Sequence, residues 1–71
     1  MNILTVGDIA RDSRWSESQI RRAFRELAED DAYPDIRRWP PAGWYGAPAE
    51  QASIVINRAR ERAERNPVKK S

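Results

Sequence analysis

The 71-residue sequence contains neither cysteine nor histidine. Without cysteine no disulfide bridge or thiolate metal site can hold the chain together, and without histidine there is no imidazole ligand or base. A chain of this length forms one domain that buries only about 60% of its unfolded surface, and the sequence has no glycine-rich phosphate loop. We therefore expect no enzyme activity, no catalytic residues, no metal site and no cofactor.

Long apolar runs are also missing. The longest, residues 54–56, has three residues, whereas a membrane-spanning helix needs about 18. The N-terminus lacks the basic segment and apolar block of a secretory signal. These absences predict a cytoplasmic protein with neither a membrane partner nor a small-molecule substrate.

The charges are unevenly distributed, although the net charge is only +2. Residues 1–32 hold five arginines and seven acidic residues, and residues 33–71 hold eight basic and four acidic residues. Of the 13 basic residues, 11 are arginine, whose planar fork pairs with phosphates and guanine edges. An arginine-rich composition also arises in genomes of high GC content, so composition alone leaves both explanations open.

Two short amphipathic helices are predicted in the first half of the chain. Thr5 and Asp8 have the spacing of a capping box, and so do Ser16 and Gln19. The predicted helices cover residues 6–12 and residues 16 to 30 or 31. Both faces of the second helix follow the i, i+3, i+4, i+7 spacing. Its apolar stripe comprises Ile20, Ala23, Phe24, Leu27 and Ala28, and its polar, largely basic stripe comprises Ser18, Arg21, Arg22 and Arg25.

These two helices and their turn follow the general helix-turn-helix pattern. Ala10 stands where the pattern has a small residue, and Trp15 where it has an apolar one. Arg14 replaces the usual glycine, which allows a positive φ. Two amphipathic helices in any small bundle would reproduce part of the pattern, so that interpretation stays open.

The second half predicts a hairpin followed by a helix. Tyr33-Pro34 ends the helical region, and residues 35–39 and 44–46 form short strands around a Pro/Gly turn. Adjacent strand residues point to opposite faces, so Arg37 and Arg38 should diverge. The tryptophans are expected in the core because each aromatic buries about 150–250 Å²; they are Trp15, Trp39 and Trp44.

The last helix is predicted over residues 49–66, with Pro48 opening it. Its inward stripe comprises Ala52, Val55, Ile56, Ala59 and Ala63. Ile54 lies off this stripe beside Arg58, and an exposed Ile is either accidental or marks a contact with another protein. The predicted domain covers residues 1–66, and residues 67–71 are expected to be a disordered basic tail.

The order of these elements resembles that of the small MerR-like winged-helix proteins, which include phage excisionases and AlpA-type prophage regulators. The resemblance covers most of residues 3–60 and rests on three places: Asp8-Ile9-Ala10 through Ile20-Arg21-Arg22, Tyr33-Pro34, and Ala42-Gly43-Trp44. It implies a mostly α fold, a small winged helix-turn-helix with a short β-hairpin wing and a C-terminal helix. The chain departs from the family at the hairpin tip, which is Pro40-Pro41 where glycine and basic residues are more common.

The resemblance also implies sequence-specific binding of double-stranded DNA, as an excisionase or a small transcriptional regulator of phage or prophage. The second helix would enter the major groove, and the turn and wing would contact phosphates. The residues expected at DNA are Ser16, Glu17, Ser18, Arg21, Arg22, Arg25, Arg14, Arg37 and Arg38. For each arginine the alternative is an exposed solubilising charge.

Small domains of this kind span few base pairs, so the resemblance implies self-association on DNA or contact with an integrase. The expected protein contact is Ile54 with Arg58 on the last helix. A competing hypothesis is a small adaptor that uses this fold to bind a host or phage protein. In that case the acidic residues would matter more than the arginines, chiefly Asp30, Asp31 and Asp35.

Overall fold

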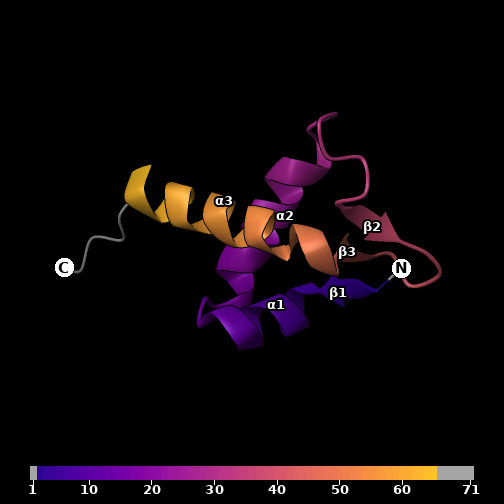
Figure 1. Cartoon of the computed structure of the whole chain (residues 1–71), viewed down its shortest axis with the longest axis horizontal. Coiled ribbons are helices and arrows are strands. Elements are labelled where there is room, and N and C mark those ends of the chain that lie inside the picture. Colours follow the sequence, from indigo (N-terminus) through magenta and orange to yellow (C-terminus); the bar gives the residue numbers. More distant parts are fainter. Residues whose placement is uncertain (1, 66–71) are drawn as a thin grey trace.

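The computed structural model describes residues 2–65 and contains three α-helices and a three-stranded antiparallel sheet. The elements in chain order are β1 (Ile3–Thr5), α1 (Val6–Ser13), α2 (Glu17–Ala28), β2 (Arg37–Trp39), β3 (Trp44–Pro48), a 3-10 turn η1 (Ala49–Gln51) and α3 (Ala52–Arg65). α3 crosses over α2 and extends to one side, while the β2–β3 turn lies at the other side (Figure 1). The predicted basic tail, residues 67–71, lies outside the described residues.

The sheet has the strand order β1-β3-β2, so the first strand of the chain joins the far edge of the hairpin. The predicted hairpin is confirmed, with Arg38 opposite Tyr45. β1 was not expected, and it pairs with β3 so that Thr5 lies opposite Gly46. Gly46 is required at this crossing, because a Cβ there would lie 2.7 Å from Ile3 Cγ2.

Both predicted capping boxes are present. Thr5 caps α1: its Oγ1 accepts from the Asp8 N–H, and its own N–H donates to the Asp8 carboxylate at 3.1 Å. Hydrogen bonds from the Thr5 backbone and hydroxyl lower the pKa of Asp8 below its ordinary value of 3.8. Ser16 caps α2 in the same way with Gln19. Each capping box satisfies backbone N–H groups at the start of its helix and so fixes where that helix begins.

The turn between α1 and α2 contains a left-handed residue. Arg14 has φ = 69°, in the position where the helix-turn-helix pattern usually has glycine. A side chain at positive φ is sterically costly, so this turn is held by the packing of the helices that flank it.

The helix ends differ from the predictions in two places. α2 ends at Ala28 and not at residue 30 or 31, because acidic residues are unfavourable at the negative end of the helix dipole. Beyond it, Asp30 Oδ1 accepts from the Ala32 N–H at 2.9 Å and forms a turn. The last helix begins with the 3-10 turn η1, and α-helical structure starts only at Ala52.

The core lies between α2, α3 and the helix-covered side of the sheet. The predicted apolar stripe of α2 is confirmed except for Ala28, which is exposed. Val55 and Ala59 are buried on the predicted inner stripe of α3. The fully or nearly fully buried apolar residues are Ile9, Ala10, Ile20, Ala23, Phe24, Leu27, Ile36, Ala47, Val55 and Ala59. Packing α2 on both α3 and the sheet leaves its remaining face in solvent.

Candidate nucleic-acid interface

The solvent face of α2 carries three exposed arginines, Arg21, Arg22 and Arg25. They are exposed because the opposite stripe of the helix is in the core, with Ile20 and Phe24 completely buried. These three arginines were all predicted at DNA. The face therefore presents three permanent positive charges within little more than one turn of helix.

A groove of about 400 Å³ runs between this face and the hairpin. Its lining residues are Ser18, Arg21, Arg22, Arg25, Arg38 and Tyr45. All of these except Tyr45 were predicted at DNA from two separate stretches of the chain. The structure thus brings the arginines of α2 and Arg38 of β2 together around one depression.

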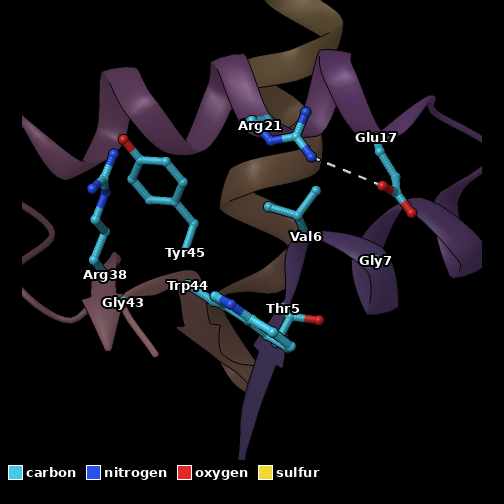
Figure 2. A pocket seen from close by; sticks show the side chains of 9 residues that line it. All are labelled: Thr5, Val6, Gly7, Glu17, Arg21, Arg38, Gly43, Trp44 and Tyr45. Atoms are coloured by element: carbon cyan, nitrogen blue, oxygen red, sulfur yellow. Dashed lines mark ion pairs between the residues drawn. The ribbon is translucent and has the colours of Figure 1, made fainter. Parts of the chain in front are cut away.

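A second groove of about 510 Å³ adjoins the first and shares Arg21, Arg38 and Tyr45 with it (Figure 2). It lies between the start of α1, the start of α2 and the tip end of the hairpin. Its lining residues are Thr5, Val6, Gly7, Glu17, Arg21, Arg38, Gly43, Trp44 and Tyr45. We call the two together the arginine groove. Glu17 enters it from the first turn of α2, where its carboxylate lies 3.9 Å from Arg21.

Tyr45 is a groove residue that the sequence analysis missed. Its ring stacks on Phe24 of the core with centroids 5.9 Å apart, and the Arg38 guanidinium carbon lies over the Tyr45 ring, 5.0 Å from its centre. Tyr45 therefore joins the core to the groove and positions Arg38. Tyr45 pairs with Arg38 in the hairpin, and this pairing identifies it as a groove residue. The sequence alone does not give the register of the two strands.

Trp44 also lines the groove, and the expectation that it belongs to the core was wrong. Its residue surface is 67% exposed. It follows Gly43 at the turn and begins β3, so it lies beyond the part of the sheet that the helices cover. Trp15 does pack against the core. Trp39 is partly buried, and its Nε1 donates to the carbonyls of Asp35 and Gly46.

Arg37 is not part of the arginine groove. The prediction that Arg37 and Arg38 diverge is confirmed, and Arg37 stacks on Trp39 with 3.9 Å between its guanidinium carbon and the ring centre. Arg37 and Arg38 therefore occupy opposite faces of β2, and only Arg38 lies with the α2 arginines.

Two further predicted residues, Arg14 and Ser16, lie in and after the turn and line neither part of the groove. Both are exposed. The Ser16 hydroxyl caps α2 and bonds to the Gln19 side chain at 3.0 Å, so it already has partners within the protein. Arg14 keeps its side chain in solvent at the edge of the α1–α2 turn.

The protein contact expected at Ile54 and Arg58 remains a prediction, but Ile54 is not the exposed residue that the sequence suggested. Ile54 is partly buried and packs against the core, because α3 lies across α2 and covers more than one stripe of the helix. Arg58 pairs with Glu26 of α2 at 3.1 Å and with Glu61 at 3.4 Å. Arg62 also pairs with Glu26. Arg58 and Arg62 thus join α3 to α2, and these two side chains and that of Ile54 are all partly covered.

No family model, curated protein or solved structure matches the chain. Within residues 2–65, no helix is both long and apolar enough to cross a membrane. The same residues hold no group of three or more acidic side chains arranged to bind a metal ion. The candidate site therefore rests on the arginine groove alone.

Proposed function

We propose that the protein is a sequence-specific double-stranded DNA-binding protein that uses α1 and α2 as a helix-turn-helix and the β2–β3 hairpin as its wing. The observation that carries the proposal is the convergence of Arg21, Arg22, Arg25 and Arg38 on one groove. Four arginines on a single face form a local positive field even though the net charge of the chain is small.

In this proposal α2 lies in the major groove of DNA. A helix reads bases there with the residues near its N-terminus, which here are Glu17, Ser18 and Arg21. Arg22 and Arg25 lie further along the helix, where phosphate contacts fix the register of a protein on the duplex. Arg38 approaches the flanking backbone from the hairpin, at the other wall of the groove.

Internal acidic partners do not neutralise these arginines equally. Glu26, the second carboxylate of α2, is taken up by Arg58 and Arg62 of α3. Within residues 2–65, Glu17 pairs with Arg21 alone, and at 3.9 Å the pair is long and exposed. No acidic side chain of this described part of the chain pairs with Arg22, Arg25 or Arg38, which supports their use in binding a polyanion.

The biological role that we propose is control of excision or transcription in a phage or prophage. This part rests on the resemblance to excisionases and AlpA-type regulators at three places: Asp8-Ile9-Ala10 through Ile20-Arg21-Arg22, Tyr33-Pro34, and Ala42-Gly43-Trp44. Sequencing the genomic fragments that copurify with the protein separates the two roles. Attachment-site arms would indicate recombination, and promoter fragments would indicate regulation.

The direct test is a titration of a fluorescently labelled random duplex at several salt concentrations. We expect the logarithm of affinity to fall linearly with the logarithm of salt concentration, with a slope of about −3 for the phosphate contacts of Arg22, Arg25 and Arg38. An absence of binding at low salt would contradict the proposal. Binding to a host or phage protein in the same preparation would then favour the adaptor hypothesis.

A matched pair of variants assigns that binding to the arginine groove. Arg22→Ala removes a groove arginine, whereas Arg60→Ala removes an exposed arginine of α3 that lines neither part of the groove. We expect R22A to weaken binding to every duplex about five- to tenfold and to reduce the salt slope by about 1. R60A should match the wild type, and equal losses in both variants would indicate general charge attraction in place of a defined site.

A further inference from the structure

Glu17 is the only carboxylate among the described residues that line the arginine groove. A negative charge in a groove that four arginines line opposes the binding of any phosphate, so its presence there needs a reason. Glu17 also begins α2, and its side chain points into the groove beside Arg21 (Figure 2). The carboxylate also lies close to the start of α1, since a Cβ at Gly7 would be in ordinary van der Waals contact with Glu17 Oε2, at 3.7 Å.

We propose that Glu17 determines base selectivity by accepting a hydrogen bond from the amino group of a cytosine in the major groove. This inference rests on the proposed DNA-binding function and assigns one base position to one residue. A carboxylate has only acceptor atoms, and among the groups that bases expose in the major groove, the cytosine N4 amino group is a donor that Glu accepts from. The guanine edge, which has acceptors O6 and N7, would repel the carboxylate.

In the protein without DNA, Glu17 pairs with Arg21, and DNA binding can break this ion pair. The Glu17 and Arg21 side chains are 64% and 57% exposed, and their charged atoms are 3.9 Å apart. An exposed pair of this kind contributes little stability, so DNA can separate it at small cost. Once separated, Glu17 pairs with the cytosine amino group and Arg21 with a guanine edge or a phosphate.

At a guanine or a thymine, whose major-groove edges carry acceptors, the separated carboxylate would gain no partner, and adenine offers its N6 amino group only beside the N7 acceptor. The consequence is weaker binding to unrelated DNA and a larger ratio of specific to non-specific affinity. Glu17 thus acts by excluding incorrect sequences as well as by recognising the correct one.

The experiment begins with selection of binding sites from a random duplex pool by the wild-type protein and by Glu17→Gln. We expect the wild-type sites to contain a fixed cytosine that E17Q no longer selects. E17Q should bind a random duplex about three- to tenfold more tightly than the wild type, because a repulsive charge has been removed. Glu50→Gln is the matched control, since Glu50 is exposed on η1 and lines neither part of the groove.

Exchange of the selected C·G pair for T·A then tests the contact itself. We expect the exchange to weaken binding of the wild type about fivefold or more and to leave E17Q within about twofold. Equal sensitivity of both proteins, or E17Q behaving as E50Q on random DNA, would overturn the role of Glu17 while leaving DNA binding intact. Failure of the wild type to bind any duplex would instead overturn the proposed function. Circular dichroism of each variant verifies that the fold is unchanged.

Discussion

Arg38 lies across the hairpin from Tyr45, with its guanidinium carbon 5.0 Å from the centre of the tyrosine ring. Its chain neighbour Arg37 stacks on Trp39 at 3.9 Å on the opposite face of the strand. Two arginines of identical charge thus stand one residue apart, and only Arg38 faces the groove that α2 lines. Comparing substitutions of Arg37 and Arg38 therefore tests which face of β2 a polyanion contacts.

Arg38→Ala should weaken DNA binding about three- to tenfold and reduce the salt slope by about 1, because one phosphate contact is lost. Arg37→Ala should leave both quantities close to the wild-type values. Fluorescence anisotropy at several salt concentrations measures both quantities. If the two substitutions cause the same loss, DNA does not distinguish the two faces of β2 and the groove is not the binding surface.

A second prediction concerns the turn before α2. Arg14 has φ = 69°, a conformation that costs a non-glycine residue about 1–3 kcal/mol. Glycine relieves this strain but adds about 0.5–1 kcal/mol of entropy cost. Arg14→Gly should therefore raise the free energy of unfolding by about 1 kcal/mol in urea denaturation.

The control for this prediction is Arg11→Gly, in the helical part of α1. Arg11 is in the last turn of this helix, where glycine should lower the free energy of unfolding by up to about 1 kcal/mol. Opposite signs for the two substitutions would verify that backbone conformation, and not the loss of an arginine, sets the effect. A destabilised R14G would mean that the Arg14 side chain contributes more than its strain costs.

Local signals in the sequence predicted much of this fold. The capping boxes at Thr5 and Ser16 located both helix starts, because each depends on residues only three positions apart. β1 could not be predicted in the same way. It has three residues, too few to show an alternating pattern, and Ile3 pairs with Pro48, which is distant from it in the sequence. Its existence depends on tertiary pairing with β3.

The site was predictable to a similar extent. Helical periodicity placed Arg21, Arg22 and Arg25 on one face, and the strand period separated Arg37 from Arg38. The sequence could not show which of Arg37 and Arg38 lies with the α2 arginines, because that depends on which side of the sheet α2 covers. Trp44 was misplaced for the same reason, since aromatic character favours burial but only the packing of the helices decides which part of a strand is covered.

A third prediction concerns acid stability. The hydrogen bonds from Thr5 lower the pKa of Asp8 in the folded protein below 3.8. A depressed folded pKa stabilises the fold above the unfolded value and loses that contribution as the pH falls through the folded value. Asp8→Asn should therefore be less stable than the wild type near neutral pH, and the difference should shrink as the pH is lowered below about 4.

Urea unfolding of both proteins across this pH range measures the difference. Thr5→Ser keeps the hydroxyl and the backbone N–H that bond to Asp8, so it should retain the wild-type pH dependence. If the difference in free energy of unfolding between the wild type and D8N stays constant with pH, the effect of the substitution is steric and not due to ionisation.

A fourth prediction concerns the attachment of α3. Glu26 receives Arg58 at 3.1 Å and also Arg62, and all three side chains are about two-thirds or more buried, with 27–31% exposed. Glu26→Gln should lower the free energy of unfolding by about 1 kcal/mol, and added salt should reduce the difference. Glu61→Gln breaks only the more exposed pair with Arg58 and should cost less than about 0.5 kcal/mol. Equal costs would contradict a special role for Glu26.

The last prediction concerns Trp44, which lines the groove but is 67% exposed (Figure 2). Because most of its surface is in solvent, Trp44→Ala should change the free energy of unfolding by less than about 0.5 kcal/mol. In the proposed complex the indole lies at the wall that faces the DNA backbone, so W44A should weaken duplex binding several-fold.

Trp44→Phe separates the two possible contributions of the indole. Phenylalanine keeps an aromatic surface and loses the N–H donor, so binding close to that of the wild type would indicate a packing contact with sugar or base. A loss equal to that of W44A would indicate a hydrogen bond from the indole to a phosphate. Unchanged binding by W44A would place this end of the hairpin outside the interface, and the DNA would then be held by α2 and Arg38 alone.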